Sequence, residues 1–312
     1  MTIHCFANFL THYGTAANNR GENQGNSTTL QKLLWDGRTH TTVSAEAIRF
    51  ALRRRLEEAQ AGSCNRRWID DADELRKMKS TKPINDWRDG EFSAWTTGKG
   101  TIFADDDLLG FMKADAANKE GEDGKAVIRR AVLELTRAVS LTPWAGDCTF
   151  NAASPGATPS AAKGKGINPA PYAAEIHATR YQYGLAMTPA RLRDPKRAAL
   201  AIEQLCALGE VAGNHARFLY DFSPESAVFR ITNDPAPRLL YCFAEVDGAV
   251  SFPALLATVQ AQDIKADELV IAGAIVANLD PAAKAVLTGA TLLPGIRAAA
   301  AEVAKRLTNA KG

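Results

Sequence analysis

The sequence lacks the patterns of small metal-binding and disulfide-bonded proteins. Its five cysteines are scattered along 312 residues with no CxxC pair, which argues against a disulfide framework and a zinc knuckle. Its five histidines show no HxxxH or HExxH spacing, and neither GxxxxGK(S/T) nor GxSxG occurs. We therefore expect no metal ion, no cofactor and no catalytic residue.

Long apolar runs and a large net charge are also missing. The longest apolar run, Leu269 to Leu279, is far shorter than the roughly 18 residues of a membrane helix. The N-terminus has neither the basic start nor the small-residue cleavage site of a signal peptide. The formal charge is +2, and 46% hydrophobic with 23% charged residues is typical of a globular chain. These features predict a cytoplasmic protein that does not enter a membrane.

Charge is nevertheless unevenly distributed along the chain. Basic residues dominate two stretches, 49–67 and 163–197, whereas acidic residues cluster at 70–74 and 105–107. Such a distribution is compatible with separate basic and acidic faces on one particle, and the former suits a nucleic-acid partner. It is equally compatible with a set of solvated helix faces.

Hydrophobic periodicity predicts alternating strands and helices. Strands are expected at 2–10 and 181–187, and helices from Ser44 to about 59 and from 195 to 208. The following elements are also predicted: a helix over 126–140, a hairpin between 216–222 and 227–231 that turns at SPES, a strand pair and a helix within 239–260, and a terminal helix over 294–307.

This order of elements predicts an α+β fold. The sheet would be antiparallel and covered by helices on one face, as in ferredoxin-like and RNA-recognition-motif proteins. Residues 1–312 would form a single domain with two excursions. Residues 62–125 are charged and turn-rich, which predicts an insertion that stands off the core, and residues 143–173 predict a mobile basic arm.

Four groups of residues could contact a single-stranded nucleic acid. Arg49 and Arg53 lie one helical turn, about 5.4 Å, apart, which is close to the spacing of successive phosphates. The loop AANNRGENQGNS offers amide groups and Arg20, and the turn GEVAGNHAR offers a close backbone approach. The arm offers cations and aromatic rings. Alternatively, the glycine-rich turn is a helix C-cap and its histidine is structural.

Four segments carry a family resemblance: VSAEAIRFALR, SLTPWAGDCTFNA, TRYQYGLAMTP and GEVAGNHARFLYDFSPES. Together they resemble the DevR family of CRISPR-associated proteins, the guide-RNA-binding backbone subunits of type I Cascade, and are closest to the I-B form. The resemblance runs from Ile3 to about Ile231. It implies a hand-shaped antiviral-defence protein with a modified RNA-recognition-motif palm, fingers at 62–125 and a thumb at 143–173.

The resemblance also implies partners and contact residues. Copies would stack head to tail along a guide RNA, and each thumb would displace a base. The assembled copies would present the guide to target DNA. Further partners would be a large subunit, a handle-capping subunit and a guide-processing endonuclease. Ala145 stands where relatives commonly have a basic residue. The expected RNA-binding residues are Asn18, Asn19, Arg20, Ser44, Arg49, Arg53, Trp144, Phe150, Lys163, Lys165, Asn214, His215 and Arg217.

Two other functions stay open. Related backbone subunits of type III complexes cut target RNA with a loop aspartate after the first strand, but here the loop from Thr11 to Thr29 contains Glu22 and no aspartate. A DNA-binding autoregulator is the other alternative, although no helix-turn-helix signature supports it. The sequence therefore favours a non-enzymatic RNA-binding subunit.

Overall fold

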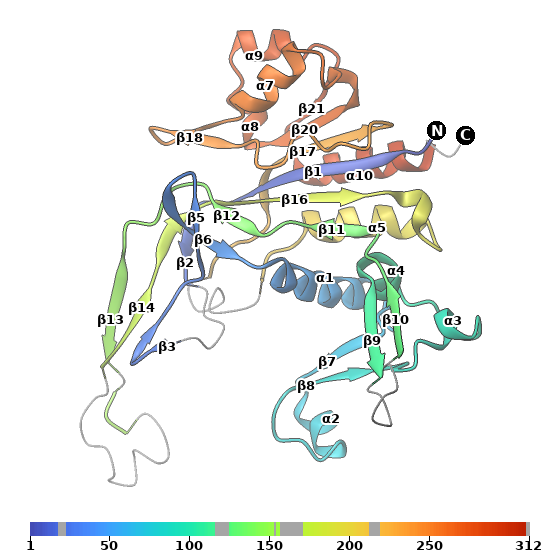
Figure 1. Ribbon diagram of the computed structural model, residues 1–312. Coiled ribbons are helices and arrows are strands. Elements are labelled where there is room, and N and C mark those ends of the chain that lie inside the picture. Colours follow the sequence, from blue (N-terminus) through green and yellow to red (C-terminus); the bar gives the residue numbers. More distant parts are fainter. Residues whose placement is uncertain (18–22, 116–124, 153, 157–170, 212–218, 310–312) are drawn as a thin grey trace.

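The computed structural model describes residues 1–17, 23–115, 125–152, 154–156, 171–211 and 219–309. None of the helices in these ranges is long and apolar enough to cross a lipid bilayer. Strands and helices are mixed along the chain, which confirms the prediction of a fold built from both (Figure 1).

A nine-stranded sheet forms the centre of the molecule, in the order β21-β20-β17-β1-β16-β12-β6-β5 with β11 beside β16. Neighbouring strands are antiparallel, except for the parallel pair β20 and β21. The strands are β1 (His4–Thr11), β5 (Lys32–Trp35), β6 (Arg38–Val43), β11 (Leu133–Leu135), β12 (Ala138–Ser140), β16 (Tyr181–Met187), β17 (Pro224–Thr232), β20 (Leu269–Gly273) and β21 (Thr291–Leu293).

Side-chain alternation divides the central strands between two hydrophobic clusters. Tyr183 of β16 and Phe9 of β1 enter one cluster, whereas Phe6 and Leu10 of β1 enter the other, because successive side chains point to opposite faces of a sheet. The prediction for residues 181–187 is confirmed, since that strand pairs with β1, β11 and β12.

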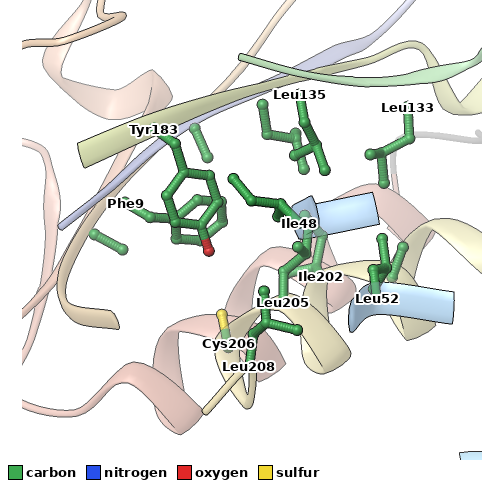
Figure 2. Close-up of a cluster of buried hydrophobic side chains, with 14 of the residues drawn as sticks. Phe9, Ile48, Leu52, Leu133, Leu135, Tyr183, Ile202, Leu205, Cys206 and Leu208 are labelled. Atoms are coloured by element: carbon green, nitrogen blue, oxygen red, sulfur yellow. The ribbon is translucent and has the colours of Figure 1, made fainter. Parts of the chain in front are cut away.

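The larger cluster lies between the sheet and four helices, α1 (Ala45–Ala59), α4 (Ala104–Leu109), α5 (Lys196–Cys206) and α10 (Ile296–Asn309). Figure 2 shows Ile48 and Leu52 of α1 and Ile202 and Leu205 of α5 converging below Tyr183. Helix α1 begins where the sequence predicts, because the Ser44 hydroxyl accepts a hydrogen bond from the backbone N–H of Ala47.

The opposite face of the sheet is also covered in part, which corrects the expectation of helices on one face only. The second cluster packs against α7 (Pro253–Gln260), α8 (Ala274–Ala277) and α9 (Pro281–Val286), on the far side of the sheet from α1 and α5 (Figure 1). A short hairpin of β18 (Ala244–Val246) and β19 (Ala249–Ser251) precedes α7. The 3₁₀ turns are η2 (Pro189–Arg191) and η3 (Ala266–Glu268).

Two predictions of secondary structure are wrong. Residues 126–140 form strands instead of a helix, because Leu133 and Leu135 pair with β16 and are buried on one face. Within the described residues 219–223 no strand precedes β17, which begins at Pro224 and pairs with β1 and β20, so the hairpin predicted at SPES is not formed there.

The insertion, residues 62–125, projects from the face of the sheet that α1 and α5 cover, and it consists of two strand pairs with short helices. Its elements are β7 (Arg66–Ile69), α2 (Ala72–Lys77), β8 (Ile84–Trp87), α3 (Ser93–Thr96), β9 (Phe111–Asp115) and β10 (Lys125–Arg129). One part does not stand off the core as expected, because Leu108 of α4 is fully buried in the main cluster.

The arm is a second projection on the same side of the sheet, and α1 lies between it and the insertion (Figure 1). It consists of β13 (Cys148–Ala152) and β14 (Pro171–Glu175), extended by β4 (Ser27–Thr28) and β3 (Asn23–Gln24) into a four-stranded sheet. A strand pair, β2 (Gly14–Ala16) and β15 (His177–Thr179), lies next to the root of the arm in sequence.

Candidate nucleic-acid interface

Helix α1 carries a row of arginines beside its buried stripe. Ile48, Leu52 and Leu56 face the core, so Arg49 and Arg54 fall on the more exposed sides of the helix. Neither of these two arginines forms an ion pair in the described ranges. They are therefore the cations of α1 that are available to an anionic ligand.

Arg53 differs from its neighbours because its guanidinium faces a buried carboxylate. Its Nε lies 3.6 Å from Oδ2 of Asp105, which is only 2% exposed. Burial lowers the pKa of Arg53, and Asp105 opposes that effect by stabilising the charged form. Arg49 and Arg53 do share a face as predicted, but Arg53 also joins α1 to the insertion.

A pocket of about 280 Å³ opens where α1 meets β7 and β8. Phe50 and Arg54 line it from the helix, and Arg66, Trp68 and Arg88 line it from the insertion. The rings of Phe50 and Trp68 meet edge to face at 5.6 Å, and Trp68 is 38% exposed. Aromatic rings next to arginines are the usual surface for stacked bases and their phosphates.

Sequence analysis did not include Phe50, Arg54 or Trp68 among the binding residues. Arg66 and Arg67 immediately precede Trp68, and Phe50 sits one residue after Arg49, so alternating basic and aromatic residues were a usable signal. What the sequence could not show is that β7 folds back onto α1.

Three consecutive carboxylates of α4 are buried, although the sequence suggested that they belonged to an exposed acidic face. Asp105 accepts hydrogen bonds from the backbone N–H of Asn65 at 2.7 Å and of Arg66 at 3.1 Å. Asp106 accepts one from the Asn65 side-chain amide at 3.0 Å. These bonds fix the start of β7 against the core.

Asp107 completes this group on the other side of α4. It pairs with the guanidinium groups of Arg129 and Arg197 and accepts hydrogen bonds from the backbone N–H groups of Arg193 and Asp194. Burial, and next the charge of Asp105, raises the pKa of Asp106 to about 7. The insertion is thus joined to the core by a network of buried charges.

The arm presents one aromatic ring to solvent and buries the polar atom of another. Phe150 of β13 is 78% exposed, consistent with a ring that can stack on a base. Trp144 donates its indole N–H to the carbonyl of Ile176 at 2.8 Å, and the Lys32 ammonium lies 4.2 Å from the centre of its ring. Trp144 therefore fixes the root of the arm.

A buried polar network next to the arm joins three strands of the sheet to β15. The Thr41 hydroxyl lies 2.7 Å from Nδ1 of His177 and 2.9 Å from the Tyr181 hydroxyl. The Thr11 hydroxyl lies 2.7 Å from that of Tyr220, which also donates to the carbonyl of Thr179. Burial, then His40, lowers the pKa of His177 to about 4, so this network is uncharged at neutral pH.

The remaining predicted residues are only partly placed by the structure. Ser44 is buried and caps α1, so its hydroxyl is occupied by the helix. The following predicted residues lie outside the described ranges, as does Glu22: Asn18, Asn19, Arg20, Lys163, Lys165, Asn214, His215 and Arg217. Of the predicted set, the structure places Ser44, Arg49 and Arg53 on one helix and Trp144 and Phe150 in the segment that forms the arm.

Comparison with known proteins decides the family. Residues 11–240 match the family model described as "CRISPR-associated negative auto-regulator DevR/Csa2". The chain is 57% identical over 310 residues to the "CRISPR-associated protein Cas7/Cst2/DevR" of Myxococcus xanthus (strain DK1622), and the match covers 98% of each sequence. This chain belongs to the DevR/Csa2 family. The resemblance of GNHARF and TRYQYG to that family is thereby confirmed.

Solved structures share the fold of this DevR/Csa2 family member. A chain of a "CRISPR RNA-guided surveillance complex, pre-nicking" superposes with a TM-score of 0.62 at 13% identity, covering 97% of this chain and 100% of that one. A chain of another "CRISPR RNA-guided surveillance complex" gives 0.56 at 14% identity, covering 98% and 99%. The likeness therefore includes the C-terminal part, which the family model does not reach.

Proposed function

We propose that this chain is a non-enzymatic backbone subunit of a type I CRISPR surveillance complex, in which several copies bind one guide RNA head to tail. One observation carries the proposal: across 97% of its length the chain shares the fold of a protein from an RNA-guided surveillance complex. Family membership agrees with it. The guide would present its bases to target DNA, alongside the other subunits of the complex.

The strand order supports a palm of the RNA-recognition-motif kind. Along the chain the palm elements follow in the order β1, α1, β11/β12, β16, α5 and β17, where β11 and β12 together take the place of one strand. In the sheet these strands lie in the order β17-β1-β16-β12. A β-α-β-β-α-β unit with the fourth and first strands adjacent is the ferredoxin-like arrangement. In this proposal the insertion and the arm are the fingers and the thumb.

The guide would lie along α1 between the two projections. Arg49 and Arg54 would contact its phosphates, because they are the arginines of α1 without an ion pair in the described ranges. Phe50 and Trp68 would contact a base, and Phe150 of the arm would stack against another. Sequence-independent binding follows from contacts to phosphates and base faces.

The experiment is a titration of fluorescent single-stranded RNA of arbitrary sequence across a salt series, read by anisotropy. The Arg49→Ala/Arg54→Ala variant should reduce the slope of log K against log salt by about 1.4, since each phosphate contact on a single strand contributes about 0.7. The matched control, Arg297→Ala/Lys305→Ala on α10, removes the same charge from exposed positions of another helix and should leave the slope unchanged.

Two further readouts separate this function from its alternatives. Light scattering should show elongated multimers on long RNA, whereas a one-to-one complex or a preference for one duplex DNA site would favour the autoregulator. Paired target RNA should survive incubation in Mg²⁺ or Mn²⁺. Cleavage that disappears in Glu22→Ala would favour the nuclease.

A further inference from the structure

A second basic pocket lies on the insertion, on the side away from the arm. Its volume is about 350 Å³, and its lining comes from α3, β9, β10 and the segment before α5. Figure 1 separates α3 and β10 widely from β13 and β14 of the arm. The pocket is therefore distinct from the proposed path of the guide.

Arginines from two distant segments converge on one indole ring in this pocket. The guanidinium carbon of Arg129 lies 4.2 Å from the centre of the Trp95 ring, and that of Arg193 lies 5.6 Å from it. Arg130 and Arg191 line the same pocket, and Phe111 and Ile128 add apolar surface. Ile128 is 66% exposed, so its side chain is accessible to a ligand in the pocket.

The positive charge of the pocket is only partly neutralised. Arg129 pairs with buried Asp107, and Arg130 pairs with Glu134. Arg191 and Arg193 are exposed and form no ion pair within the described ranges. Both residues line the pocket, so their positive charges favour a bound anion.

Two donors of the pocket wall also have no acceptor. The indole N–H of Trp95 and the Nε–H of Arg129 are both buried and form no hydrogen bond with any described residue. Both atoms lie beneath the pocket surface, so the exposed guanidinium groups of Arg191 and Arg193 are the donors that a ligand would reach. Phosphate offers acceptor oxygens in the geometry that guanidinium groups recognise.

We propose that this pocket binds the phosphates of a second single-stranded nucleic acid, separate from the strand along α1. Arg191 and Arg193 contact the phosphates, and the apolar rim at Ile128 and Phe111 contacts sugars or bases. An acidic peptide would use the arginines but leave this apolar rim uncovered, so the mixed lining favours nucleic acid. The subunit then holds one strand on each side of the insertion.

The test uses the full chain loaded with unlabelled RNA and then titrated with a labelled oligothymidylate that cannot pair with the RNA. Arg191→Ala/Arg193→Ala should weaken capture of the labelled strand about tenfold at 0.1 M salt and reduce its salt slope by about 1.4, with unchanged affinity for the RNA. The same two alanine variants used above provide the comparison. Arg49→Ala/Arg54→Ala should weaken RNA binding but not capture of the oligothymidylate, and Arg297→Ala/Lys305→Ala should weaken neither RNA binding nor that capture.

Three results would overturn the proposal. The first is undiminished capture of the labelled strand by Arg191→Ala/Arg193→Ala. The second is an equal loss of RNA affinity in that variant, which would place the pocket on the path of the first strand. The third is binding of polyglutamate in preference to oligothymidylate. If the wild-type chain binds no RNA, the proposed function fails, and the same variants titrated with oligothymidylate alone still decide the pocket.

Discussion

The two projections of the molecule are attached to the same sheet by different physics. The insertion is held by buried carboxyl groups, since Asp105, Asp106 and Asp107 of α4 bind side chains and backbone of the segments around them. The arm is held by strand pairing at its root, by uncharged hydrogen bonds such as that of Trp144, and by a partly exposed ion pair between Glu175 of β14 and Lys32 of β5. The carboxyl groups of the first attachment are buried, whereas the ion pair of the second is partly exposed to solvent.

This difference matters for a protein that would polymerise on RNA. Buried ion pairs have strict geometry and are costly to break singly, so they fix the direction of the insertion relative to α1. Short strand pairs tolerate local opening more readily, which suits an arm that closes over a ligand. The contrast predicts which substitutions affect folding and which affect only the arm.

The largest expected effect is that of Asp107→Ala. The change leaves the partly buried Arg129 and Arg197 without their carboxylate and deprives two backbone N–H groups of an acceptor. We expect a loss of about 3–5 kcal/mol in the free energy of unfolding, measured by urea denaturation. Asp73→Ala is the control, because Asp73 is 77% exposed in a surface pair and should change stability by less than about 0.5 kcal/mol. A loss below about 1 kcal/mol in Asp107→Ala would contradict the charged attachment.

The second prediction concerns pH. The pKa of Asp106 is raised from 3.8 to about 7 by burial and by Asp105, so between these values the folded chain holds a proton that the unfolded chain has released. Stability from this group is complete below about pH 4 and falls as pH rises toward 7, by at most about 1.4 kcal/mol per unit. Urea denaturation of the wild type and Asp106→Asn across this range should show a flatter profile in the variant. Parallel profiles would exclude Asp106 as the source.

Local patterns of sequence were sufficient for α1 and for the central strands β1 and β16. Ser44 and the stripe at Ile48 and Leu52 locate α1, and the alternation through Tyr181 and Tyr183 locates β16, because both signals depend on neighbours within a few residues. The same periodicity failed at 126–140, where pairing with β16 overrides the helical spacing of the valines and leucines.

The candidate site was harder to predict, because its chemistry depends on residues far apart in the sequence. Arg53 is separated by 52 positions from Asp105, so nothing near it indicates that its charge is already balanced. Trp144 looks like a free ring until Ile176 and Lys32 are placed around it. Exposure is a property of the fold, and a sequence pattern identifies only the type of residue.

The third prediction tests the hydrogen bond and the ring contact that Trp144 makes at the root of the arm. Trp144→Phe removes the hydrogen bond to Ile176 and weakens the contact with Lys32, at a cost of about 1–2 kcal/mol. We expect faster hydrogen exchange in Cys148–Ala152 and Pro171–Glu175, by about tenfold, with little change in the insertion. Trp35→Phe, which alters a ring of edge strand β5 that packs against Tyr241 and not against Ile176, is the matched control. Equal acceleration in both projections would remove the contrast between them.

The smallest effect on the fold is expected for Phe150→Ala. The ring is 78% exposed on β13, so its removal should change the free energy of unfolding by less than about 0.5 kcal/mol. If the ring stacks on a base, RNA affinity should fall by about 1–3 kcal/mol in the anisotropy titration. Val246→Ala, an exposed apolar residue of β18 on another part of the molecule, should leave affinity unchanged. The arm can then lose this contact residue without unfolding, whereas unchanged affinity in Phe150→Ala would mean that the arm holds RNA by other residues.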